Sequence, residues 1–191
     1  MDSTRLAQIR KNFYLSTRAR VESIIGRETS QLGHYRKKYE AEMRRMPYSS
    51  VRKRQFIHRM KKARLILVGD FHALKQSSRG LLRILRKMDS PVILCLECIY
   101  SEDQRYLDQF LAGVLNEKDF LSRIQWKKKW SFPWENYRPL FKWAQSTNAK
   151  VFGINISTKA KTLKERDEAS AELIQKIRLA NQQEQIFIQF K

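Results

Sequence analysis

Four polar residues with ligand-capable or ionisable side chains follow apolar runs that are typical of strands. They are Asp70 and His72 after 65–68, Glu97 after 92–96 and Asn155 after 151–154. The carboxyl ends of parallel strands meet at one edge of a sheet, about 4.8 Å apart from strand to strand, so we expect these side chains to share a crevice. Two carboxylates and an imidazole can bind a divalent metal ion or act as general acid and base. The structural alternative is that Asp70 caps a solvated turn.

The elements that would position these residues are those of an α/β domain. Four apolar runs predict strands at 65–68, 92–96, 151–154 and 186–190, the first of them buried. Amphipathic segments with helical spacing separate the runs, which favours β-α-β units with parallel strands. We therefore predict an α/β fold over 63–191, with a mainly parallel central sheet flanked by helices.

The first 62 residues are predicted to form a basic helical N-terminal extension, with helices over 4–25, 29–45 and 51–62. Residues 1–64 contain 18 Lys and Arg but only five Asp and Glu, so they carry +13 of the net charge of +20. Such a charge favours an acidic partner or an anionic membrane surface. Nucleic acid is the less favoured partner, because the aromatic residues lie at core spacing rather than where bases would stack. The alternative is a set of solvated helix faces.

The two cysteines do not predict thiol chemistry. Cys95 and Cys98 have the spacing of a redox pair, but such pairs usually open a helix, whereas these lie in a strand and at its end. We expect Cys95 to be a small buried side chain. A zinc site with four thiolates is excluded because there is no second cysteine pair.

The first twenty residues are polar and charged and have no signal peptide or lipobox. No run approaches the roughly 18 apolar residues of a spanning helix. As the sequence stands, it predicts a cytoplasmic protein.

A series of motifs occurs in a fixed order over about 63–190. The motifs are Gly69-Asp70-Phe71-His72, Leu96-Glu97, Asp103-Gln104-x-x-Leu107-Asp108-x-Phe110-Leu111-x-Gly113, Phe120-Leu121, Trp130-x-Phe132-x-Trp134-x-x-Tyr137-Arg138-Pro139-Leu140-Phe141 and Gly153-Ile154-Asn155. The series resembles the ChaN-like haem-binding uptake family of the Tiki, or erythromycin-esterase-like, superfamily. Its members are often exported lipoproteins, unlike the chain as it stands here.

The resemblance implies haem as the cofactor, a role in iron acquisition, and a binding protein rather than an enzyme. Haem iron needs an axial ligand such as His or Tyr. The residues that the resemblance puts forward for haem or ligand binding are His72, Tyr137, Arg138, Tyr100, Trp130, Trp134 and Asn155. Arg138 would pair with a propionate, or else with a loop acid such as Glu135. For the aromatic residues the alternative is packing in the core. A homodimer stays open.

Three alternatives to haem binding remain. Distant members of the superfamily are metal-dependent hydrolases that use a Gly-x-x-His element and a glutamate, which carries over to His72 and Glu97 with Asp70 beside them and a divalent metal ion as cofactor. The second is a basic module for nucleic acid or anionic membranes. The third is an inactive remnant, because the family usually continues after the fourth strand with a second Gly-Asp-x-His-like turn, so the chain is expected to be a truncated member.

Overall fold

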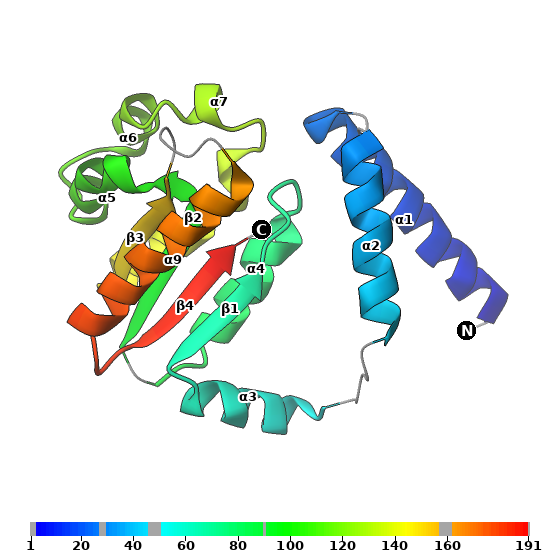
Figure 1. Ribbon diagram of the computed structural model, residues 1–191, viewed down its shortest axis with the longest axis horizontal. Coiled ribbons are helices and arrows are strands. Elements are labelled where there is room, and N and C mark those ends of the chain that lie inside the picture. The colour runs from blue at the N-terminus through cyan, green and yellow to red at the C-terminus, as the bar shows by residue number, and fades with distance from the viewer. Residues whose placement is uncertain (1–2, 27–29, 46–50, 90, 157–161, 191) are drawn as a thin grey trace. The chain divides into compact units, whose positions relative to one another are not determined.

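The computed structural model describes residues 3–26, 30–45, 51–89, 91–156 and 162–190 (Figure 1). The chain divides into two compact units, Met1–Val51 and Arg52–Lys191. The second unit includes helix α3 (Lys53–Lys62), which the sequence analysis assigned to the extension. The side-chain amide nitrogen of Gln185 lies 2.7–3.1 Å from the carbonyl oxygens of Met60, Lys61 and Ala63, so the end of α3 is bonded to the unit that contains the sheet.

The first unit contains the two predicted helices, α1 (Ser3–Ile25) and α2 (Ser30–Arg45). Helix α1 ends at Gly26, whose φ of 80° lies in the left-handed region and whose N–H donates to the carbonyl of Glu22 at 3.0 Å. Glycine adopts this conformation without the steric cost that a Cβ atom would bring. Among the described helices, none is long and apolar enough to cross a membrane.

The second unit is built on a sheet of four parallel strands in the order β1-β4-β2-β3. The strands are β1 (Leu65–Gly69), β2 (Val92–Tyr100), β3 (Lys150–Asn155) and β4 (Gln185–Phe190). All four lie where apolar runs predicted them, and the α/β class with a parallel sheet is confirmed. Because β4 lies between β1 and β2, the turn after β1 and the end of β2 face each other across the end of β4.

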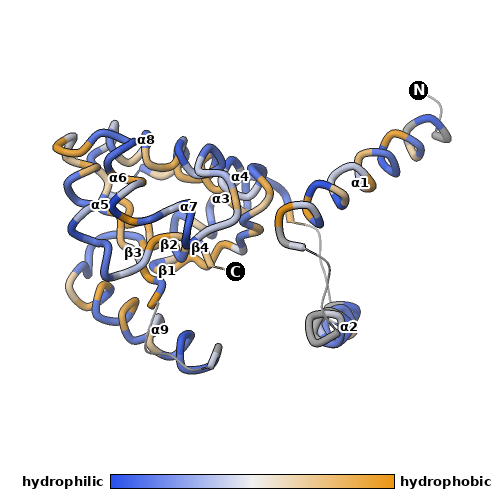
Figure 2. Tube along the Cα trace, turned by 90° about the horizontal axis from the view of Figure 1, so that it is seen from above, coloured by the Kyte–Doolittle hydropathy of each residue, from blue (hydrophilic) through white to orange (hydrophobic). Residues whose placement is uncertain are grey.

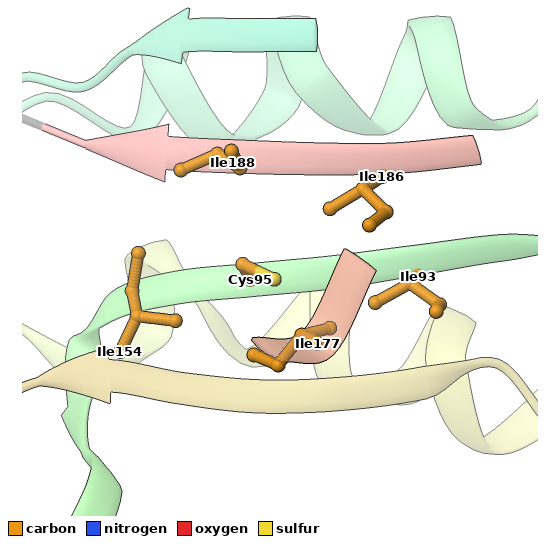
Figure 3. Close-up of a cluster of buried hydrophobic side chains, with 6 residues drawn as sticks. All are labelled: Ile93, Cys95, Ile154, Ile177, Ile186 and Ile188. Atoms are coloured by element: carbon orange, nitrogen blue, oxygen red, sulfur yellow. The ribbon is translucent and has the colours of Figure 1, made fainter. Parts of the chain in front are cut away.

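Helices cover both faces of the sheet (Figure 2). Helix α9 (Leu163–Ala180) lies on one side, and α4 (Lys75–Leu85) and α8 (Arg138–Thr147) lie on the other. Beneath α9, buried side chains from three strands pack around Ile177, among them Ile93, Ile154 and Ile188 (Figure 3). Burial on both faces explains why the inner strands are continuous apolar runs.

Between β2 and α8 in the sequence, the chain forms a series of short helices. They are η1 (Ser101–Asp103), α5 (Gln104–Leu111), α6 (Glu117–Arg123), α7 (Trp126–Lys129) and η2 (Trp134–Asn136). Asn116 caps α6, because its side chain accepts from the N–H of Asp119, and Thr162 caps α9, because its hydroxyl accepts from the N–H of Glu165. Asn and Thr are both common at this position of a helix.

Two strands differ from their prediction. The run at 65–68 is not a buried strand, because β1 lies at the sheet edge, where Leu67 is 71% exposed. Strand β2 continues past Leu96 to Tyr100 after an irregularity in its register with β3, so Glu97 lies inside the strand rather than at its end. Gly153 permits this course, since a Cβ atom there would lie 2.7–2.9 Å from atoms of Ile99 and Tyr100.

Candidate functional site

The turn after β1 brings Asp70 and His72 to the carboxyl edge of the sheet. The N–H of Asp70 donates to the carbonyl of Phe190 at 2.9 Å, which extends the pairing of β1 with β4 by one residue. The N–H of Phe71 then donates to the hydroxyl of Ser77 in α4. The carbonyl of His72 accepts from the side-chain amide of Asn136 at 3.1 Å. The backbone on both sides of the acid is therefore held in place.

Asp70, His72 and Tyr137 converge on one carboxylate oxygen. Nδ1 of His72 lies 2.7 Å from Oδ2 of Asp70 and 2.6 Å from the Tyr137 hydroxyl, which itself donates to Oδ2 of Asp70. Because a carboxylate accepts hydrogen bonds, the arrangement favours the tautomer in which Nδ1 carries the proton. In that tautomer Nε2 carries the lone pair of the ring.

Nε2 of His72 faces a second acid. It lies 3.8 Å from Oε2 of Glu97, and Oε1 of Glu97 lies 3.5 Å from a guanidinium nitrogen of Arg166 in α9. Glu97 is buried, and the His72 side chain is 11% exposed. We call Asp70, His72, Glu97, Tyr137 and Arg166 the strand-edge cluster. It joins the turn after β1 to β2, α9 and the segment before α8.

Aromatic rings enclose the imidazole of His72. Phe132 stacks on it with centroids 4.6 Å apart, and Trp130 lies 5.7 Å away at an angle of 60°. Trp130 also stacks on Tyr100 at 5.6 Å. Trp130 and Phe132 also form part of the wall of a groove of about 900 Å³, a size that holds small-molecule ligands in proteins, and His72 is not among the residues that line it.

Burial keeps the phenol of Tyr137 protonated. Loss of solvent is the largest cause that raises its pKa well above the ordinary value, and the negative charges that Cys98, Asp70 and Glu97 can carry act in the same direction. The pKa of Tyr100 is also raised, by burial first and then by Glu102 and Asp103. Neither tyrosine is disposed to become a phenolate.

The cysteines are buried thiols, as expected for Cys95. Burial raises the pKa of Cys95 to about 12 and that of Cys98 well above the ordinary value, and Asp70 and Glu97 raise the latter further. Because the thiolate is the nucleophile, these environments suppress thiol chemistry.

The other predicted residues are divided between the cluster and the core. Trp130 and Tyr100 lie beside the cluster, whereas Trp134 is buried with its ring 4.7 Å from that of Phe141. Asn155 is buried at the end of β3, in register with Tyr100.

Arg138 is bonded away from the cluster. Its Nε lies 2.8 and 3.0 Å from the two carboxylate oxygens of Glu117, and its guanidinium lies 3.6 Å from Glu135. The hydrogen bond from Arg138 is the largest cause that lowers the pKa of Glu117. These pairs match the loop-acid alternative for Arg138.

Sequence reasoning missed Arg166, Asn136 and Phe132 as members or supports of the site. The capping pattern Thr162/Glu165 contained a usable signal for Arg166, since it starts a helix just beyond the carboxyl end of a strand. Phe132 belongs to the aromatic motif but was not named as a candidate for the site, and Asn136 lies at an unspecified position of that motif.

The predicted metal ligands Asp70, His72 and Glu97 lie close together. Across the described ranges, however, no group of three or more His, Cys, Asp and Glu side chains is arranged to hold a metal ion. Oδ2 of Asp70 accepts from His72 and Tyr137, whereas its Oδ1 is buried without a hydrogen-bond partner among the described residues.

The chain was compared with known protein families. Residues 56–187 match the family described as haem-binding uptake, Tiki superfamily, ChaN, which is more than half of the chain. No curated protein sequence matches the chain at a significant level.

Solved structures share the fold at low sequence identity. A structure of ChaN from Campylobacter jejuni, described as binding haem cofacially, has 15% identity and a TM-score of 0.51, over 74% of this chain and 75% of that one. The C-terminal region of Pasteurella multocida toxin, described as having a thiol-protease-like catalytic triad, has 17% identity and a TM-score of 0.54, over 73% of this chain and 20% of that one.

A third structure, described as bacterial protein toxins, has 16% identity and a TM-score of 0.50. The match covers 98% of this chain but 41% of that one. This chain therefore spans less than half of either toxin chain. At these identities the likenesses establish the fold alone.

Proposed function

Because the chain belongs to the ChaN family of haem-binding uptake proteins in the Tiki superfamily, we propose that it binds haem through the imidazole of His72. One observation carries the proposal: Nδ1 of His72 is held by Asp70 and Tyr137, which leaves Nε2, 3.8 Å from Oε2 of Glu97, as the ring nitrogen outside these bonds. Histidines that bind metals are usually fixed in this way, with the second nitrogen bonded to a carboxylate. Together with haem as the ligand, we propose for this chain the family's role in iron acquisition.

Among the three candidate iron ligands, His72 is the best supported. A tyrosine binds haem iron as the phenolate, and burial opposes this form at Tyr137, whose hydroxyl donates to Asp70. The raised pKa of Tyr100 opposes it there as well. A neutral imidazole needs no such ionisation. In this account Tyr137 and Asp70 orient His72, and Tyr137 does not touch the iron.

The surroundings of His72 fit a large apolar ligand with acidic groups. Phe132 and Trp130 pack against the imidazole, and Arg166, which pairs with Glu97 and Asp167, supplies a cation beyond Glu97. When bound, haem would supply an iron centre with its own ligand chemistry. His72 would hold that centre, and Arg166 would be the cation for its acidic groups.

The metal-dependent hydrolase is the less supported alternative. Catalytic zinc sites usually take three protein ligands. Asp70, His72 and Glu97 are three in number, but within the described part of the chain they are not arranged to hold a metal ion, and one oxygen of Asp70 orients the imidazole. Haem iron requires only one or two axial ligands, a demand that His72 can meet.

The test is a titration of the folded full-length chain with haemin, followed by the Soret band. The chain has three histidines, and His34 and His58 are both exposed, so they provide matched controls for adventitious ligation. His72→Ala should weaken binding at least about tenfold, the equivalent of about 1.4 kcal/mol. His34→Ala and His58→Ala should bind like the unchanged protein. Equal binding by all four proteins, or binding by none, would overturn the proposal.

A further inference from the structure

A patch of mixed apolar and basic side chains lies on α1, in the unit that the haem proposal does not use. Ile9, Phe13 and Tyr14 are 48%, 63% and 61% exposed, and Arg5 and Arg10 are exposed beside them. We call these five residues the α1 patch. Residues three or four apart are neighbours on a helix, so Arg5, Ile9 and Phe13 form one row, and Arg10 and Tyr14 form the row beside it.

Each row therefore combines a cation with an aromatic ring. Farther along the helix, Val21 and Ile24 are half-buried. Apolar side chains gathered on a surface in this way are typical of a binding site rather than of a solvated face. The unit Met1–Val51 has eleven Lys and Arg against five Asp and Glu, which gives it a net charge of +6.

We propose that the α1 patch binds the surface of an anionic membrane, with Phe13 and Ile9 entering the interface and Arg5 and Arg10 pairing with lipid phosphates. Helices that lie in the membrane interface carry both apolar or aromatic residues and Lys or Arg. On α1 the two kinds of residue share neighbouring rows. Each cation near an anionic leaflet adds about 1 kcal/mol of attraction. The proposal is independent of haem binding.

Charge and chemistry favour a membrane over a second copy of the chain and over nucleic acid. A second copy of the chain would bring another +20 of net charge to the contact, and like charges repel. Nucleic acid would attract the arginines, but it offers no apolar layer for an aliphatic side chain such as Ile9. A lipid interface has both the negative charge and the apolar depth.

The patch can be probed with an environment-sensitive fluorophore. Both native cysteines are buried with raised pKa values, so a cysteine introduced at an exposed position should react selectively. Ser16 lies three residues after Phe13 and is not one of the patch residues, so Ser16→Cys leaves the patch intact. The control is Val114→Cys, because Val114 is 72% exposed in the second unit. With vesicles of phosphatidylcholine and 30% phosphatidylserine, the label at 16 should shift to the blue and the label at 114 should not.

Vesicle co-sedimentation of the full chain then separates the contribution of the arginine charges from that of the apolar side chains. Arg5→Gln with Arg10→Gln should weaken binding about 30-fold, from two charges at about 1 kcal/mol each. Ile9→Ser with Phe13→Ser should weaken it by about tenfold or more, from the lost apolar burial. Lys176→Gln in the second unit should have no such effect. Binding should fall as NaCl is raised, because salt screens the charges.

Four results would overturn the proposal. They are equal binding to neutral and anionic vesicles, no binding to either at low salt, a label at 16 that responds to single-stranded RNA but not to vesicles, and a label that shifts with protein concentration alone. The third result would make the patch a nucleic-acid site, and the fourth would make it an interface between copies of the chain. The histidine variants of the haemin titration should bind vesicles unchanged, so failure of one proposal leaves the other testable.

Discussion

The strand-edge cluster and the α1 patch both gather ionisable and aromatic side chains, but they hold them in opposite ways. In the cluster, Asp70 and Tyr137 are buried, and the side chains of His72 and Tyr137 both bond to Oδ2 of Asp70. In the patch, Arg5 and Arg10 are exposed on one helix. A buried charge is costly unless it is paired, whereas an exposed charge interacts weakly. We therefore expect substitutions to reduce folding stability in the cluster and to leave it unchanged in the patch.

The largest effect should follow from Asp70→Ala. The change removes the shared acceptor and leaves the Tyr137 hydroxyl and Nδ1 of His72 buried without it, at a cost of about 3 kcal/mol of unfolding free energy. Urea denaturation measures the change. The control is Asp89→Ala, because that side chain is 79% exposed and its ion pair with Lys61 lies at the surface. Equal effects of the two variants would break the contrast between buried and exposed pairing.

Gly153→Ala tests how the end of β2 is held near the cluster. The added Cβ would meet the backbone carbonyls of Ile99 and Tyr100, and overpacking of this kind costs about 2 kcal/mol. Because Glu97 lies in the same stretch of β2, haemin binding should weaken as well. Gly80→Ala is the matched control, since a Cβ there meets nothing within 4 Å and alanine favours a helix. If the unfolding free energy of Gly153→Ala equals that of the unchanged protein, this stretch of β2 accommodates the added Cβ without loss of stability, and the prediction is wrong.

The buried thiol of Cys95 predicts a loss of stability at alkaline pH. Its pKa is about 12 in the folded chain and near 9 in the unfolded chain, so the unfolded state releases its proton first as pH rises. The contribution of this thiol to the unfolding free energy is fully present below pH 9 and is lost progressively between pH 9 and 12, with about 1.4 kcal/mol lost from pH 8 to pH 10. Urea denaturation at pH 8 and pH 10 measures this loss, and Cys95→Ala should lack this part of it. An equal loss in Cys95→Ala and the unchanged protein would contradict the burial of the thiol.

The smallest effect on folding should follow from the charges of the α1 patch. Arg10→Gln should change the unfolding free energy by less than about 0.5 kcal/mol, as is usual for exposed positions. The same substitution should weaken vesicle binding severalfold. A large loss of stability would mean that Arg10 belongs to the packing of the first unit, and the contrast between the two regions would fail.

Much of the fold followed from the sequence, because apolar runs and helical spacing record burial directly. The four strands lie where the runs predicted them, and the turn at Asp70 and His72 lies at the predicted edge. The strand order did not follow, and neither did the exposure of Leu67, since both depend on β4 lying between β1 and β2. No local pattern records such a placement.

Most members of the candidate site were predictable from the sequence, but Arg166 and the contacts between the members were not. His72 and Tyr137 were both named as haem ligands, yet they are 65 residues apart, and only the packing places the Tyr137 hydroxyl on Asp70. The reach of Arg166 to Glu97 was missed for the same reason, because the direction of a side chain depends on the neighbours that surround it.

The most direct test of the central claim compares His72→Ala with Tyr137→Phe in the haemin titration. If His72 binds the iron and Tyr137 orients it, His72→Ala should lose the Soret shift, and Tyr137→Phe should keep it with affinity reduced by less than about tenfold, the cost of one lost hydrogen bond. Loss of the shift in Tyr137→Phe, with its retention in His72→Ala, would contradict the account and make the tyrosine the ligand.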